Sequence, residues 1–214
     1  MHGLFLASFQ KRTVAGVADP VRTGVSDPGY NKTRNHIMPH VIFATAFGPC
    51  GLAWNETGLT GFVLPDVDET RLKRRLAGRD PNAGTAIAPE NAPPWVQEII
   101  ARVQQHLAGD LQDFAGLRYD FASATAFQRQ VYEFALTVKP GHTRTYGDVA
   151  HALGLPPGGA RSVGTALGEN RWPLLVPCHR FIGASGKMTG FSAPGGIQTK
   201  IRLLALEGAQ LLSE

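Results

Sequence analysis

The chain has 214 residues, of which 43% are hydrophobic and 18% charged, with a formal net charge of +4 at pH 7. This composition is typical of a globular protein and excludes a chain that is disordered throughout. No apolar run approaches the roughly 20 residues of a transmembrane helix, so we expect no membrane association. The only two cysteines, Cys50 and Cys178, lie far apart, which excludes a disulfide framework and indicates a reducing compartment.

The positive charge is concentrated in the C-terminal part of the chain. From residue 126 onward there are nine Lys/Arg and five Asp/Glu, whereas the first 125 residues hold twelve of each. Such an excess fits a polyanionic partner such as nucleic acid. A balance of +4 also occurs in proteins without such a partner, so charge alone does not identify one.

Residues 1–37 differ from the rest of the chain. They are rich in Gly, Pro, Asp, Asn and basic residues and show no sustained hydrophobic period. We therefore expect a poorly ordered N-terminal extension. Met38 opens the patterned part of the sequence, so translation that starts there is one hypothesis for the native protein.

Residues 38–122 are predicted to form a small α/β domain with a short antiparallel sheet. Three strands separated by Gly, Pro and Asn turns are expected at Val41–Phe47, Gly51–Trp54 and Gly61–Leu64, and Cys50 is expected in the turn before the second. Leu117–Phe121 is a further strand candidate. Because His40 and Cys50 have no partners at zinc-ligand spacing, we expect no metal site.

Two helices are expected in the same domain. The first follows acidic residues from Asp66 onward, which suit a helix N-terminus, and ends near Gly78. The second opens at Pro93 or Pro94. Its apolar residues recur at helical spacing: Val96, Ile99, Ile100, Val103 and Leu107.

Residues 123–214 are predicted to form a mostly helical domain. Ser123 or Thr125 caps its first helix, and Pro140 lies beyond the end of that helix. Two short helices follow, at 148–153 and 160–167, joined by a Gly-containing turn, which indicates a helix-turn-helix. The second helix of such a unit enters a nucleic-acid groove, and Arg161 lies in its first turn. A last helix is expected from Ile197 to Glu207.

The stretch from Asn170 to Arg180 carries the strongest chemical signal. A strand-like apolar run, Leu174–Val176, leads through Pro177 to Cys178, His179 and Arg180. A cysteine beside a base and a positive charge is typical of an activated nucleophile, since the thiolate is the reactive form. A single cysteine is also a common buried packing residue, and the tripeptide alone is compatible with both interpretations.

Together, the motifs of this C-terminal part resemble the methylated-DNA–protein-cysteine methyltransferases, also called O6-alkylguanine-DNA alkyltransferases. Each motif is weak alone, but their order and spacing are specific. The strands from Val41 to Leu64 resemble the family's more variable N-terminal domain, and residues 1–37 match nothing in it. The matching residues are Phe127-Gln128, Val131-Tyr132, Pro140-Gly141, Thr145 to Ala150, Ala160 to Gly164, Asn170, Val176 to Arg180, Gly190 to Ser192, and Lys200 to Gly208.

The resemblance implies an α+β fold of two domains that follow the extension 1–37. These are an N-terminal α/β domain, 38–122, and a C-terminal DNA-binding domain, 123–214, whose winged helix-turn-helix carries the active-site Cys178. It implies DNA repair by irreversible, single-turnover transfer of a methyl or alkyl group from O6-alkylguanine, and also O4-alkylthymine, to Cys178. It implies no cofactor and no metal. The expected protein is a monomer that binds double-stranded DNA from the minor groove, in the cytoplasm or, in a bacterium, on the nucleoid.

The resemblance also assigns the chemical roles. His179 would accept the proton of the Cys178 thiol through a bound water, and Glu207 would hold His179 in the right tautomer. That role gives a purpose to a carboxylate at a helix C-terminus, where it opposes the helix dipole. Tyr146 would donate its hydroxyl proton to a ring nitrogen of the departing guanine.

Five further residues are assigned to substrate and DNA binding. Arg161 would fill the gap left by a flipped-out nucleotide, and Asn170 would tie the recognition helix to the active-site segment. Ser192 would contact O6, and the backbone carbonyl of Phe181, like that of Cys178, would accept from the exocyclic amine. Arg180 is the fifth residue that we expect to bind the substrate or DNA.

Three other functions fit these residues less well. A non-catalytic lesion-binding protein of the same fold would lack the cysteine. A cysteine hydrolase would have no use for a helix-turn-helix or for Arg161. A methylation-sensing transcription factor would need a further DNA-binding or metal-binding domain.

Overall fold

The computed structural model describes residues 38–77, 84, 86–188 and 190–209, which all belong to one unit, Asn35–Glu214. The expected extension, 1–37, lies outside the described residues. In the part of the chain that is described, no helix has the length and apolar character needed to cross a membrane.

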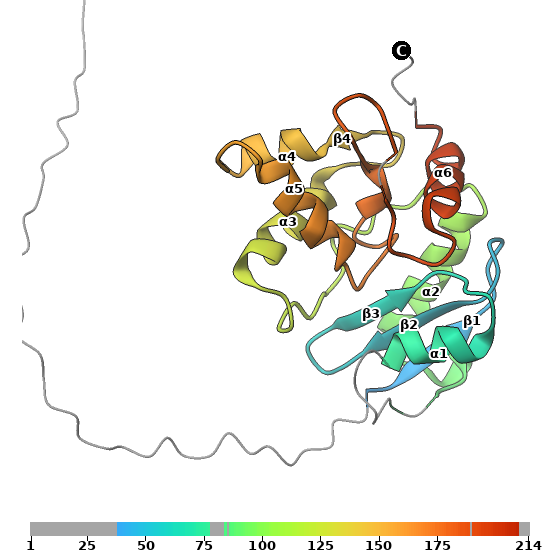
Figure 1. The fold of residues 1–214 in the computed structure, drawn as a ribbon. Helices are drawn as coiled ribbons and strands as arrows, with labels where there is room; N and C mark the ends of the chain where they lie inside the picture. The colour runs from blue at the N-terminus through green and yellow to red at the C-terminus, as the bar shows by residue number, and fades with distance from the viewer. Residues whose placement is uncertain (1–37, 78–83, 85, 189, 210–214) are drawn as a thin grey trace, which may run out of the picture. The chain divides into compact units, whose positions relative to one another are not determined.

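A three-stranded antiparallel sheet forms the N-terminal half of this unit. Its strands β1 (His40–Phe43), β2 (Cys50–Trp54) and β3 (Leu59–Val63) are paired in sequence order. Helix α1 (Glu69–Ala77) covers one face and α2 (Pro94–Leu107) the other, as Figure 1 shows. The alternation of strand side chains explains the two layers. On the α1 face Ala53 and Val63 pack with Leu72 and Leu76, and on the α2 face Val41, Leu52 and Phe62 pack with Val96, Ile99 and Val103.

The structure confirms three strands and two helices here and shifts their ends. Cys50 is the first residue of β2, where a turn was expected. The next residue, Gly51, leaves room for α1, because a Cβ there would clash with the Leu72 and Leu76 side chains. A short 3-10 turn, η1 (Pro89–Asn91), precedes α2.

The predicted strand Leu117–Phe121 is wrong. This segment forms one isolated parallel bridge, between Leu59 and Tyr119. The chain then turns away because the Asp120 carboxylate accepts from the backbone N–H of Ala122 at 3.0 Å, a local bond that competes with continued strand pairing.

The C-terminal half begins with three helices. Helix α3 (Ala126–Thr137) has Thr125 as its N-cap, in a capping box with Gln128, which decides between the two predicted caps. Helices α4 (Tyr146–Ala152) and α5 (Gly159–Gly168) pack together around the predicted turn, in which Gly158 has φ 90°. Helix α4 starts at Tyr146, earlier than expected, because Thr145 and Asp148 form another capping box.

The remaining elements surround the Cys-His-Arg stretch. Strands β4 (Arg144–Thr145) and β5 (Phe181–Ile182) form a two-residue parallel pair, and α6 (Gly196–Leu206) ends with Glu207 as its C-cap. The α4–α5 pair supports a helix-turn-helix, whereas the wing stays a prediction.

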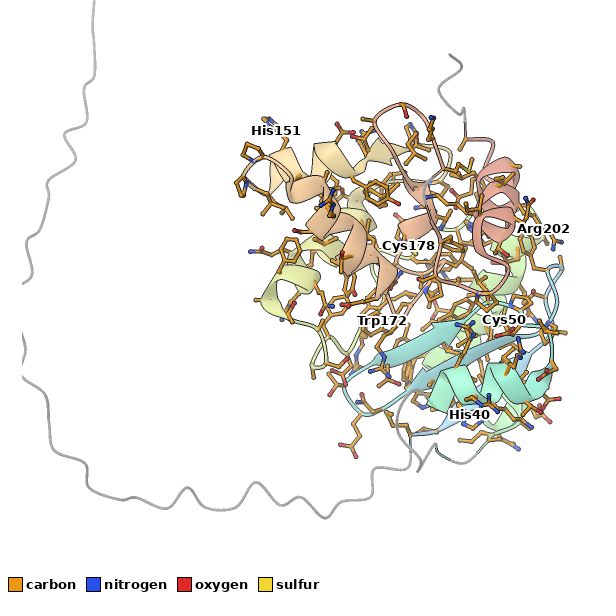
Figure 2. The ribbon with its side chains drawn as sticks, in the orientation of Figure 1. His40, Cys50, His151, Trp172, Cys178 and Arg202 are labelled. Carbon is orange, nitrogen blue, oxygen red and sulfur yellow. The ribbon has the colours of Figure 1, made fainter. Side chains whose placement is uncertain are left out.

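Trp172 joins the sheet to the segment that precedes Cys178 (Figure 2). Its side chain is only 1% exposed, and its indole N–H donates to the Leu59 carbonyl of β3 at 2.9 Å. Its ring meets Tyr119, Phe121 and Tyr132 edge-on. One hydrophobic core therefore contains residues from both sides of the predicted domain boundary at 122/123, which stays a prediction.

Because Trp172 joins the two parts of the core, we expect its substitution to lower the free energy of unfolding. Trp172→Phe removes the hydrogen bond to Leu59 and leaves space beside a buried ring, so it should cost about 2–3 kcal/mol of unfolding free energy. Trp95→Phe, the same change at a half-buried position on α2, should cost less than about 1 kcal/mol. Urea unfolding measures both, and equal losses would contradict the role of Trp172.

Candidate active site

Cys178 opens a short 3-10 turn, η2 (Cys178–Arg180), and is only 6% exposed. The run before it is not the strand we expected. Leu174 adopts φ 79°, a left-handed conformation that no strand contains, and the Val176 N–H donates back to the Trp172 carbonyl at 2.8 Å. The approach to Cys178 is thus a tight turn, which places the thiol at the end of a loop.

Asn170 holds this turn in place from the end of α5. Its amide nitrogen lies 2.8 Å from the Val176 carbonyl and 3.2 Å from Cys178 Sγ, and its amide oxygen accepts from the Trp172 N–H at 2.9 Å. Both ends of the amide are therefore bound, and the side chain links the end of α5 to the turn that carries Cys178.

The Cys178 thiol is protonated at neutral pH. Burial raises its pKa to about 11, although the Asn170 hydrogen bond and the nearby Lys200 charge oppose this rise. The other cysteine, Cys50, is also buried, and its pKa is raised to about 12. Because only a thiolate is a strong nucleophile, Cys178 needs a base to take its proton.

His179 has the protonation state of such a base. Its side chain is fully buried, and Nε2 lies 3.0 Å from Glu207 Oε1. A carboxylate only accepts hydrogen bonds, so Nε2 carries the proton and the lone pair is on Nδ1. Nδ1 is buried and has no hydrogen-bond partner among the described residues. Burial lowers the pKa of His179, and the Glu207 carboxylate partly offsets this, so the ring is neutral at pH 7.

Arg180 pairs with the same carboxylate. Its Nε lies 2.9 Å from Glu207 Oε2, its Nη2 2.7 Å from Oε1, and its Nη1 donates to the Val138 carbonyl. Burial alone would raise the pKa of Glu207, but hydrogen bonds from His179 and Arg180 and the close polar contact with His106 hold it far below its usual range. Arg180 thus lies behind the cysteine, buried against Glu207, rather than toward solvent, where DNA would bind.

His106 is a functional candidate that the sequence analysis missed. It comes from α2, is fully buried, and its Nε2 lies 3.2 Å from Glu207 Oε1. Its place in the sequence could have indicated burial, since it lies three residues after Val103 and seven after Ile99, two predicted core positions. Nothing local to α2 indicates that its buried partner is a carboxylate 101 positions further along the chain.

The pocket at Cys178 has a volume of 850 Å³ and is bordered by the helix-turn-helix and the loop before α6. Of the candidate site residues, Tyr146, Arg161 and Ser192 line it together with Cys178. Arg161 and Ser192 are exposed, whereas Tyr146 is half-buried with Lys200 Nζ 5.8 Å from its ring centroid. The Phe181 side chain is buried, and its carbonyl accepts from Lys200 Nζ.

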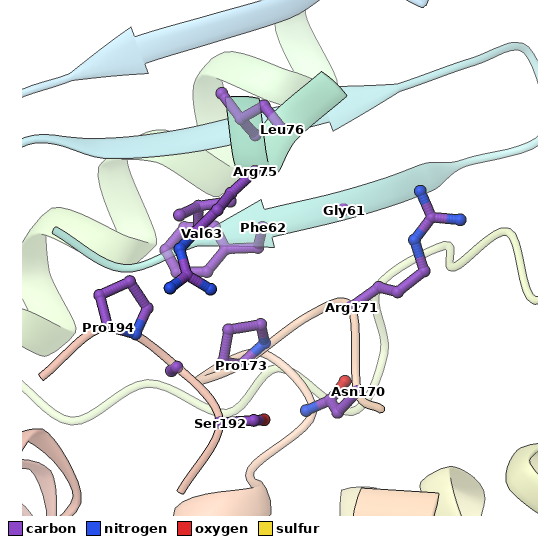
Figure 3. Close-up of a pocket in the computed structure, with 11 residues that line it drawn as sticks. Gly61, Phe62, Val63, Arg75, Leu76, Asn170, Arg171, Pro173, Ser192 and Pro194 are labelled. Carbon is purple, nitrogen blue, oxygen red and sulfur yellow. The ribbon is translucent and has the colours of Figure 1, made fainter. Parts of the chain in front are cut away.

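A second cavity, of 240 Å³, lies between β3 and the loops around Asn170 and Ser192 (Figure 3). Two of its polar groups already have partners: Asn170 is bound as described, and Arg75 Nε lies 2.6 Å from the Asp66 carboxylate. We therefore assign the chemistry to the pocket at Cys178. Among the described residues, no group of three or more His, Cys, Asp or Glu is arranged to hold a metal ion.

Comparison with known proteins gives a consistent result. Residues 126–209 match the family model "6-O-methylguanine DNA methyltransferase, DNA binding domain". The methylated-DNA–protein-cysteine methyltransferase of Mycobacterium leprae is 36% identical over 166 residues, which are 78% of this chain and 90% of that protein. The enzyme of the same name from Methanosarcina acetivorans is 34% identical over 181 residues, covering 80% and 99%.

Solved structures agree with the sequence relatives. The crystal structure of Mycobacterium tuberculosis OGT in complex with DNA has a TM-score of 0.61 and 33% identity, and the match covers 79% of this chain and 92% of that one. The O6-methylguanine methyltransferase structure from the same organism has a TM-score of 0.62 and 32% identity, with 80% and 93% covered. On the extent and identity of these matches, this chain belongs to the methylated-DNA–protein-cysteine methyltransferase family.

Proposed function

We propose that this protein repairs alkylated DNA by moving the alkyl group of O6-alkylguanine onto Cys178 in a single turnover. One arrangement carries the proposal: a buried thiol in a pocket beside a helix-turn-helix, with a neutral histidine next to it whose tautomer is set by a buried carboxylate. This is the nucleophile, base and orienting-group arrangement of covalent catalysis.

The reaction balances with side chains of this protein, the alkylated base and one bridging water. His179 Nδ1 takes the thiol proton through a bridging water, and the resulting thiolate attacks the alkyl carbon. The S–C bond forms while the C–O6 bond breaks, and its electron pair passes to the guanine ring. Tyr146 donates a proton to a ring nitrogen as that charge develops, and the proton held by His179 then returns to Tyr146 through solvent, which leaves both side chains neutral. The thioether is stable because a thiolate is a poor leaving group from an uncharged alkyl sulfide, so water does not regenerate Cys178 and the protein is spent after one event.

Access to O6 requires that the nucleotide leave the duplex, because the atom is inside the base stack. We assign Arg161, at the exposed start of α5, to the gap left by the nucleotide, and Ser192 and the Phe181 carbonyl to contacts with the flipped base. Approach from the minor groove suits a protein that must act at any sequence, because that groove distinguishes base pairs poorly. A monomer suffices for this task.

A non-catalytic lesion-binding protein is the second candidate. The same pocket and helix-turn-helix would serve it. The Cys178–His179–Glu207 arrangement favours transfer, because a protein that only binds the lesion has no need of a base beside a thiol.

Methyl transfer from DNA to Cys178 can be measured directly. Mixing the protein with an oligonucleotide that carries one O6-methylguanine should add one methyl group, mapped to Cys178, and intact-protein mass spectrometry measures this gain. Cys50→Ala should gain the methyl as the wild type does, and Cys178→Ala should not. Tight lesion binding without a mass gain would favour the lesion-binding function.

Glu207→Gln should slow methyl transfer at least about 100-fold, because the neutral amide no longer stabilises the His179 imidazolium. The Kd for DNA should change less than about threefold, since Glu207 is buried behind the pocket. The variant leaves Arg180 unpaired and should lose about 3–5 kcal/mol of stability, so rates are measured where circular dichroism shows it folded. Glu133→Gln, an exposed carboxylate on α3, should match the wild type. A parallel fall in affinity would indicate a mainly structural Glu207.

Arg161→Ala should slow repair in duplex DNA about tenfold or more and should leave the reaction with free O6-methylguanine base unchanged, because a group that supports flipping acts only on the duplex. Single-turnover rates on the two substrates measure the difference. Arg129→Ala, which removes an exposed arginine of α3, is the control. Equal losses on both substrates would refute the assignment.

A further inference from the structure

His106 brings α2 into contact with the charged groups behind Cys178. Its side chain is fully buried, with Nε2 3.2 Å from Glu207 Oε1. The pair lacks the alignment of a full hydrogen bond, yet both side chains have no exposure to water. A buried polar atom this close to a carboxylate interacts with it strongly, because no solvent screens the pair.

The other ring nitrogen defines the tautomer. His106 Nδ1 accepts from the backbone N–H of Gln112 at 3.0 Å. Nδ1 therefore carries a lone pair, and in the neutral ring the proton is on Nε2, facing Glu207. The loop after α2 thus holds His106 as a donor toward the carboxylate.

Two histidines consequently face one oxygen. Glu207 Oε1 has His106 Nε2 at 3.2 Å, His179 Nε2 at 3.0 Å and Arg180 Nη2 at 2.7 Å, whereas Oε2 has Arg180 Nε. Arg180 already neutralises the charge of the carboxylate. Every donor on Oε1 reduces the negative charge that the oxygen offers to the other donors.

We propose that His106 is a positioning residue that fixes the orientation of Glu207 and limits how strongly this carboxylate stabilises protonated His179. The inference rests on the proposed function, in which His179 is the base. Helix α2, which carries His106, then affects the pH at which the cysteine reacts. No described residue of the N-terminal part of the chain lines the pocket at Cys178 itself.

The alternative is that His106 only fills space. Its ring does pack at 5.3 Å from the Phe114 ring, a contact that an apolar side chain could equally make. Both of its nitrogens, however, face polar partners, and a packing role requires neither of these contacts. The charged and titratable groups facing His179 are Glu207, Arg180 and His106, and those facing Glu207 are His106, His179 and Arg180.

The test is the pH dependence of single-turnover methyl transfer. His106→Phe keeps an aromatic ring but removes the donor. Oε1 then interacts more strongly with protonated His179, so the pKa of His179 rises and the ascending limb of the rate profile moves to higher pH by about 0.5–1 unit. The variant should be about 3–10-fold slow at a pH below that limb and should approach the wild type above it.

Two variants separate the donor from packing. His106→Gln places an amide N–H near the position of Nε2 and should return the limb to the wild-type pH. Phe114→Leu disturbs the same packing without touching the donor, so it should lower stability and leave the limb unmoved. If the ascending limb of the pH–rate profile stays at the wild-type pH in His106→Phe, the proposal is overturned. This holds even if the variant is slower than the wild type by the same factor at every pH.

A measurement on the wild-type protein covers the case in which His106→Phe does not fold. Imidazole ¹⁵N NMR should find His106 protonated at Nε2 and unprotonated at Nδ1 at pH 7. The opposite tautomer would overturn the proposal. If the wild type fails to accept a methyl group at all, the proposed function fails, and that result is distinguishable from a transfer-competent protein with an unmoved limb.

Discussion

The buried carboxylate of Glu207 is the interaction on which the rest of the site depends. A single ion buried in a protein interior is costly unless it is paired and hydrogen-bonded. Glu207 meets this requirement with donors from η2 and a close polar contact from α2, and it is itself the C-cap of α6. Three segments far apart in the sequence are thereby held together behind Cys178. The same carboxylate sets the tautomer of His179, so the pairing that offsets its burial also prepares His179 for the proposed role of base.

The raised pKa of Cys178 has a chemical consequence. A permanent thiolate would be open to oxidation and to other electrophiles. Here burial keeps the resting thiol protonated, while neutral His179 holds a lone pair on Nδ1. In the proposed reaction, proton transfer occurs when a substrate fills the pocket and the negative charge passes from the sulfur to the departing guanine. The structure therefore favours a Cys178 thiolate that forms during the reaction over one that is present in the resting protein.

Much of the fold could be predicted from local signals. The Thr125 cap, the turn at Gly158 and the apolar spacing of α2 are properties of neighbouring residues, and the helices are close to where these signals put them. The errors have non-local or side-chain causes. The predicted strand Leu117–Phe121 ends in a turn because Asp120 accepts a local hydrogen bond. The run Leu174–Val176 is not a strand because Leu174 has a left-handed backbone conformation. The contact of His106 with Glu207 depends on tertiary packing between residues that share no pattern, and the pairing of Glu207 with His179 was available only from the family resemblance.

The two halves of the described unit contribute differently to the site. The residues that line the pocket at Cys178 all lie between Tyr146 and Ser192, within the part of the chain that carries the whole positive excess. The sheet half, residues 38–125, has seven Lys/Arg and ten Asp/Glu, so its net charge is negative and does not attract a polyanion. Its contribution is positional: the Leu59 carbonyl of β3 holds Trp172 and so fixes the turn that presents the thiol, while α2 brings His106 to Glu207. These contacts are buried and directional. A displacement of the sheet would therefore move Glu207 and His179 without any change in the residues that line the pocket at Cys178. If His106 acts as proposed, a change in the N-terminal half alters the reactivity of the cysteine while the residues that line the pocket stay the same.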